Sequence, residues 1–216
     1  MEPLGPDGDF GISGLGMRIA GMHGPTNRTE TLEFVTRHLN QRSPWAAAAL
    51  NSDIRRLAAS PLSDADLETL WLSTTSRRFD PENYSGGIRG FLAEITDISS
   101  RFLRPGDVPA FERQTSQFDP EGIRQRILEE ISSIREPLLA RCDPLARDAI
   151  IPLLQRAVNE LGSDLGMRLF LRALKTSFAR MGLARLARFE MLGEQLGYSD
   201  LVVADGTLNT FLGPND

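Results

Sequence analysis

Apolar residues recur at helical spacing along most of the chain. The two clearest sets share intervals of four, three and four residues: Phe91, Ile95, Ile98 and Phe102, followed by Ile127, Ile131, Ile134 and Leu138. These intervals place each set along one face of an α-helix, and they are the seam spacing of helices that pack nearly side by side. The pattern therefore predicts a mostly all-α fold, a multi-helix bundle in which each helix buries one apolar stripe.

The segments that carry these two stripes resemble each other. Residues 75–103 and 115–139 both begin with Thr-Ser, continue with Phe-Asp-Pro-Glu and Gly-Ile-Arg, and then enter the apolar stripe. Self-similarity of this kind usually marks one supersecondary unit that is used twice. We expect a duplicated helical unit within one helical domain over residues 27–200.

Start and stop signals predict further helices. Ser43 followed by Pro44 is typical of a helix start, and this helix should run to about Ala59. Ser63 with Asp66 resembles a capping box. Helical spacing predicts three more helices, over residues 31–40, 164–181 and 183–196.

The two ends of the chain have a different composition. Residues 1–26 are dense in glycine and proline, which predicts a flexible N-terminal arm. In residues 201–216, Asp205-Gly206 separates two β-prone runs, which is the signal of a tight hairpin turn. Since an isolated hairpin is marginal in water, we expect this C-terminal β-hairpin to dock on the helices.

The composition is that of a globular protein and limits the expected partners and cellular compartment. The chain has 216 residues, of which 41% are hydrophobic and 25% charged, and its formal net charge is -5. An acidic balance disfavours nucleic acid as a partner. Cys142 is the single cysteine, so no disulfide forms within the chain, and neither a basic-then-apolar leader nor a membrane-spanning apolar run occurs. We expect a cytoplasmic protein without a transmembrane segment.

No constellation of residues identifies a reaction. His23 and His38 are the only histidines, and the spacings His-x-x-x-His and Cys-x-x-Cys do not occur. We therefore expect no metal and no cofactor, and we assign no catalytic residue. An enzyme with carboxylates such as Glu94 and Glu130 in an interhelical pocket is the alternative, because function depends on sites placed on folds.

The strongest charge asymmetry lies between Met167 and Phe189. This segment has no acidic residue and contains six cations: Arg168, Arg172, Lys175, Arg180, Arg185 and Arg188. Such a basic strip is suited to an acidic partner protein, a nucleic-acid backbone or an anionic membrane surface. The other interpretation is pairing with acidic helices of the same chain, for example those with Glu129, Glu130 and Glu136.

These observations predict a surface function. We expect a non-enzymatic protein-protein interaction module, an adaptor, chaperone-like or assembly subunit whose grooves or basic strip bind another protein. Self-association stays open. A nucleic-acid-binding helical protein is the third and weakest alternative.

Overall fold

The chain divides into two compact units. The computed structural model describes residues 8–21, 23–76, 86–103, 120–142, 144 and 146–211. One unit comprises Phe10–Gln114 and is called the N-terminal unit; Thr115–Asp216 together with Met1–Asp9 form the C-terminal unit. Eleven helices and one sheet of two short strands occur in the described residues, which confirms the mostly all-α prediction. The division differs from the single helical domain expected over residues 27–200.

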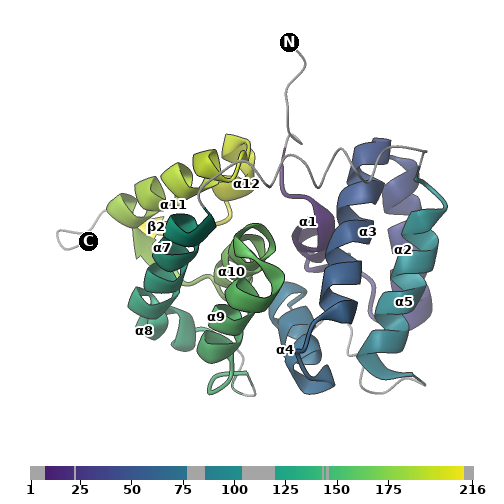
Figure 1. The fold of residues 1–216 in the computed structure, drawn as a ribbon, viewed down its shortest axis with the longest axis horizontal. Helices are drawn as coiled ribbons and strands as arrows, with labels where there is room; N and C mark the ends of the chain where they lie inside the picture. Colours follow the sequence, from purple (N-terminus) through teal and green to yellow (C-terminus); the bar gives the residue numbers. More distant parts are fainter. Residues whose placement is uncertain are drawn as a thin grey trace, which may run out of the picture. The chain divides into compact units, whose positions relative to one another are not determined.

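The N-terminal unit is built around one central helix. Its helices are α1 (Gly11–Ile19), α2 (Arg28–Asn40), α3 (Pro44–Ala59), α4 (Asp64–Thr74) and α5 (Gly87–Ser100). Helix α3 lies between α1 and α5, and α5 also packs against α2 and α4 (Figure 1). The predicted start of α3 at Pro44 and its end at Ala59 are confirmed.

Helix α1 is the main correction to the sequence prediction. Residues 11–19 were expected in a flexible arm, yet they form a helix whose Ile12, Leu15 and Ile19 are buried. Glycine here serves close packing: a Cβ at Gly16 would lie 2.9 Å from the carbonyl oxygen of Thr74. The arm prediction is therefore wrong for these residues, and residues 1–7 lie outside the described part of the chain.

A free N-H group at the start of α1 donates a hydrogen bond to a neighbouring helix. The amide of Ile12 donates to the buried carboxylate of Asp53 on α3, at 3.0 Å. A negative charge at a helix N-terminus is favoured by the helix dipole. Phe10, just before α1, packs edge-on against Trp45 of α3 with ring centroids 5.0 Å apart.

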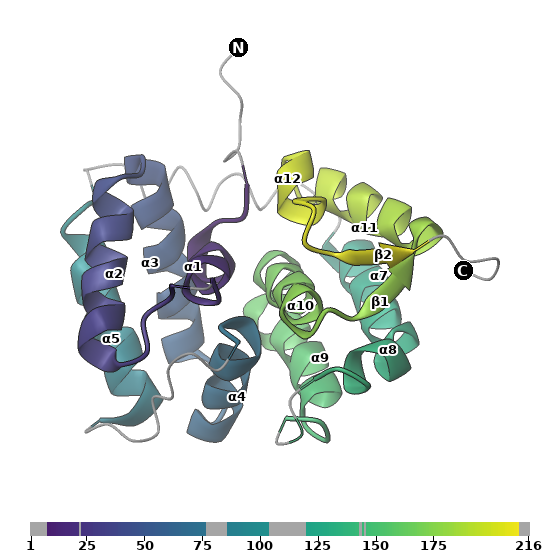
Figure 2. The same ribbon diagram turned by 180° about the vertical axis from the view of Figure 1, so that it is seen from behind.

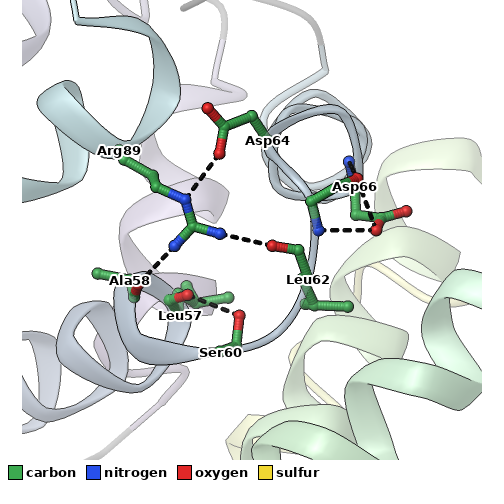
Figure 3. A network of polar contacts seen from close by, with 8 residues as sticks. Leu57, Ala58, Ser60, Leu62, Asp64, Asp66 and Arg89 are labelled. Atoms are coloured by element: carbon green, nitrogen blue, oxygen red, sulfur yellow. Dashed lines mark hydrogen bonds and ion pairs between the residues drawn. The ribbon is translucent and has the colours of Figure 1, made fainter.

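A polar network fixes α5 to the turn between α3 and α4 (Figure 3). The guanidinium of Arg89 pairs with Asp64 at 2.7 Å and donates to the carbonyl oxygens of Ala58 and Leu62. Beside it, Ser63 and Asp66 form the predicted capping box, with both reciprocal bonds present. One arginine thus satisfies carbonyls that the end of α3 and the following turn leave open.

The C-terminal unit contains the remaining helices and both strands. Its elements are α7 (Pro120–Ser133), α8 (Arg135–Leu139), α9 (Ile150–Leu161), α10 (Ser163–Ser177), β1 (Arg180–Gly182), α11 (Leu183–Gln195), α12 (Asp200–Val203) and β2 (Asn209–Phe211). Helix α10 packs on α9 and α7, and both strands contact α11 (Figure 2). Proline fits where it begins an element: Pro137 and Pro152 lie in the first turns of α8 and α9.

Helix α10 ends at a residue in an unusual conformation. Phe178 has φ +51°, in the left-handed region, and its side chain is exposed. The amide of Phe178 donates to the carbonyl of Lys175 and that of Ala179 to the carbonyl of Leu174, at 3.3 and 3.1 Å. This is the Schellman arrangement, in which the left-handed position is usually glycine.

The predicted C-terminal hairpin is wrong. Residues 200–203 form helix α12, in which Val202 and Val203 are buried, instead of a strand. The strand that does form, β2, pairs in parallel with β1, in the register Arg180 with Asn209. Asp205 accepts hydrogen bonds from buried Lys175 and from Thr207. It therefore pairs with a buried cation and does not form the tip of a hairpin. Local β-propensity was outweighed by these tertiary contacts.

The two stripes that suggested a duplication form helices in different units. Helix α5 packs on α3 in the N-terminal unit, whereas α7 packs on α9 in the C-terminal unit. Residues 77–85 and 104–119, which carry the rest of both repeats, lie outside the described residues. The helices are confirmed, and the duplication itself stays a prediction.

Candidate functional site

A groove runs between α2 and α5 on the N-terminal unit. Its volume is about 470 Å³. The lining comes equally from the two helices: Thr29, Leu32, Glu33 and Thr36 of α2, and Glu94, Asp97, Ile98 and Arg101 of α5 and its C-terminal cap. Each set follows the spacing i, i+3, i+4, i+7, which is one face of a helix.

The groove has a half-buried floor and an exposed rim. Leu32 and Ile98 are half-buried and bring one aliphatic side chain from each wall. Glu33 and Asp97 are exposed and bring one carboxylate from each wall. A narrow apolar strip is therefore bordered on both sides by negative charge.

The walls are held from behind by the core. Val35 and Leu39 of α2 and Phe91 and Ile95 of α5 are buried, so each helix has one face in the core and its next face in the groove. The start of α2 is fixed by Asn27, whose side chain accepts the amide of Glu30 at 3.0 Å. Both walls are thus rigid elements, which suits a preformed site.

Glu94 has one satisfied and one open oxygen. Its Oε1 pairs with Arg28, the first residue of α2. Its Oε2 is buried and has no hydrogen-bond donor among the residues that the structure describes. Buried polar atoms without a partner are rare, and each calls for an explanation.

The predicted basic strip is largely enclosed in the C-terminal unit. Arg168 and Lys175 are each only 1% exposed. Arg168 holds Asp164 through two bonds of 3.2 and 2.8 Å, and Tyr198 donates to the same carboxylate at 3.0 Å. Lys175 donates to Asp205 at 2.8 Å and to a backbone carbonyl.

Two further members of the strip have weaker partners. Arg172 is buried and donates to the hydroxyl of Thr176 at 3.3 Å. Burial lowers the pKa of its guanidinium, while the carboxylates of Asp9 and Asp205 act in the opposite direction. Arg180 is exposed and stacks over the ring of Phe211, with 4.5 Å from the guanidinium carbon to the ring centre.

The last two cations share one carboxylate. Arg188 and Arg185 of α11 both pair with Glu130 of α7, Arg185 at 3.6 Å, and Glu130 is buried. This arrangement favours pairing within the chain, the second interpretation of the strip. Glu94, the other carboxylate named in the enzyme alternative, belongs to the N-terminal unit.

The sequence pointed to only part of the groove. The sequence named Glu94 as a candidate carboxylate, whereas Ile98 was assigned to the buried stripe of its helix. The signal for the groove was a second stripe displaced around α2 and α5, in which each helix has one aliphatic residue next to an acidic one. This second stripe indicates a groove only when α2 and α5 are known to be neighbours.

The described residues show no metal-ligand cluster and no membrane-spanning helix, and known proteins indicate no further site. In the described part of the chain, no group of three or more His, Cys, Asp or Glu side chains is placed to hold a metal ion. A search of the same residues finds no helix with the length and apolarity to cross a membrane. No protein-family model, no curated protein and no solved structure matches the chain.

Proposed function

We propose that this protein is a non-enzymatic interaction protein of the cytoplasm whose α2–α5 groove receives a helical segment of a partner protein. The observation that carries the proposal is the lining of the groove by two neighbouring helices, each with an i, i+3, i+4, i+7 face. Amphipathic helices commonly bind in grooves of this kind, with their apolar face on the floor.

A third helix would complete the packing of the N-terminal unit. Leu32 and Ile98 are half-exposed at the floor, and a helix laid along the groove would remove their remaining apolar surface from water. Two helices side by side offer a valley whose spacing matches the ridges of another helix. A small polar ligand would leave this aliphatic floor unused.

The proposal moves the partner surface away from the basic strip. Arg168 and Lys175 are buried in ion pairs, so their charged groups do not present a surface to a partner. An acidic partner surface was expected from these residues. The groove is acidic at its rim, and it therefore favours a partner of the opposite charge.

Site-specific photo-crosslinking in lysate of the source cells tests the proposal. A photoreactive amino acid at Thr29 of one wall and Asp97 of the other should crosslink to the same short segment of one protein. The same amino acid at Arg37, an exposed position of α2 outside the groove, should not. A synthetic peptide of the captured segment should bind the purified chain and gain helical circular dichroism. Crosslinks that are equal at all three positions, or that lead to nucleic acid, count against the groove as a protein receptor.

A steric variant provides the matched control. Thr36→Trp fills the groove from its α2 wall, whereas Arg37→Trp adds the same bulk at the adjacent exposed position. The first should abolish peptide binding, and the second should leave it within about twofold, because Arg37 does not line the groove. Equal effects of the two variants would contradict the site.

A further inference from the structure

We infer that the helical segment received by the groove carries lysine or arginine on both sides of an apolar stripe. The inference rests on the proposed function and names the chemistry of the partner. Its basis is the placement of the carboxylates along the groove.

The two walls carry acidic residues at opposing rims. Glu33 lies on α2 and Asp97 on α5, and both are exposed. A helix that sets its apolar stripe on Leu32 and Ile98 brings its flanking positions beside these carboxylates. Flanking charges of this kind select partner and orientation in helical assemblies. Cationic flanks would be attracted on both sides, and acidic flanks repelled.

Glu94 supplies an acceptor between the rims. Its Oε2 lacks a donor among the described residues, and its Oε1 is shared with Arg28. That pair is about one-third exposed at both side chains, and pairs of this exposure hold weakly. A rotation of the Glu94 carboxylate therefore brings Oε2 to the surface of the groove. There it can accept a hydrogen bond from an incoming guanidinium, which donates to two acceptors at once.

Arg101 gives the groove a polarity. It caps the C-terminal end of α5 and is the exposed cation of the lining. Like charges placed together suppress wrong partners and wrong registers. The cations of the partner segment should therefore face Glu33, Glu94 and Asp97, with a neutral or acidic residue at the position next to Arg101.

Three designed peptides test the inference by fluorescence anisotropy. Each is a helix of about 18 residues, or five turns, with the same leucine stripe. The flanking positions are arginine in the first peptide, glutamine in the second and glutamate in the third. We expect the arginine peptide to bind at least about tenfold more tightly than the glutamine peptide, and its affinity to fall as salt rises from about 0.05 to about 0.5 M. The glutamate peptide should bind most weakly.

Matched charge variants locate the effect. Glu33→Gln with Asp97→Asn should reduce the affinity for the arginine peptide about tenfold, as expected for two partly exposed charge contacts. Glu190→Gln with Glu194→Gln removes the same charge from exposed positions of α11 in the other unit, and it should change the affinity less than about twofold. Equal losses in the two double variants would mean a general attraction to an acidic protein and would overturn the inference.

The outcomes separate this inference from the proposed function. Equal affinities of the arginine and glutamine peptides, both lost in Thr36→Trp, would overturn the charge requirement and leave the groove as a helix receptor. Failure of all three peptides to bind would also overturn the charge inference. The crosslinks from Thr29 and Asp97 would then decide the proposed function alone.

Discussion

The two units use their charged residues in opposite ways. In the C-terminal unit, Arg168 and Lys175 are buried and each is matched by a carboxylate of the same unit. In the N-terminal unit, Glu33 and Asp97 stand exposed at the rims of a groove. Four of the six cations that are crowded in sequence pair with carboxylates of their own unit, whereas acids that lie far apart in sequence converge on a groove of the other unit.

This difference teaches that clustering along the chain says little about exposure. Helix α10 is covered on all sides over Asp164–Lys175, so even its polar face is buried. A buried ion must be paired or hydrogen-bonded, because desolvation is costly. Exposed charges stay hydrated and need no partner within the fold, so they remain available to another molecule.

Removal of one member of a buried pair should have the largest effect on stability. Lys175→Met leaves Asp205 without its ammonium partner, and we expect the C-terminal unit to lose about 3 kcal/mol. The exposed pair Arg156–Glu160 is the control, and Arg156→Met should cost less than about 0.5 kcal/mol. Both tryptophans, Trp45 and Trp71, belong to the N-terminal unit, so the effect is measured by hydrogen exchange of α9 and α10. A cost below about 1 kcal/mol for Lys175→Met would remove the contrast between the units.

Tyr198, which donates to the Asp164 carboxylate paired with Arg168, gives a pH test. Burial, followed by the charge of Asp164, raises the pKa of the Tyr198 hydroxyl well above its ordinary value. A raised pKa means that the stability is present below the unfolded value of about 10 and is lost as pH rises beyond it. Tyr198→Phe should cost about 1–2 kcal/mol at neutral pH and flatten the alkaline decline, as followed by denaturant unfolding between about pH 9 and 11. Parallel pH profiles of the two proteins would contradict the assignment.

The sequence predicted elements whose signals lie within one helix. The start of α3 at Pro44 and the capping box of Ser63 and Asp66 depend on residues at most three positions apart, and both are confirmed. Helix α1 was missed because its glycines look like loop residues, whereas Gly16 allows close approach to Thr74. A local pattern cannot reveal the neighbour that makes a glycine useful.

The candidate site was harder to predict because it depends on two helices. Each wall alone is an ordinary amphipathic helix, and Ile98 fits a core stripe as well as a groove floor. The basic strip had a strong sequence signal, yet its outcome depended on Asp164, Asp205 and Glu130 from other positions. The Asp164–Arg168 pair follows the i,i+4 spacing within one helix, whereas the pairing of Lys175 with Asp205 and of Arg188 with Glu130 is determined by tertiary structure.

The end of α10 provides a test of opposite sign. Phe178 adopts a left-handed conformation although it is 61% exposed, so little packing compensates for the conformational cost. Phe178→Gly should stabilise the C-terminal unit by about 0.5–1 kcal/mol, since glycine adopts this conformation without steric penalty. Phe178→Ala removes the same side chain without that relief and serves as the control. Hydrogen exchange of α10 measures both, and equal behaviour of the two variants would argue against strain.

Neutralisation of the groove rim should have the smallest effect on stability. Glu33→Gln with Asp97→Asn alters exposed side chains that the fold does not bury, so the free energy of unfolding should change by less than about 0.5 kcal/mol in tryptophan fluorescence. Any change should be a small gain, because like charges on a shared surface repel each other. Were this double variant instead to destabilise the unit as strongly as Lys175→Met destabilises the other, the rim carboxylates would be structural. The contrast between charges that stabilise the fold and exposed charges proposed to bind a partner would then no longer stand, because the charges of both units would stabilise the fold.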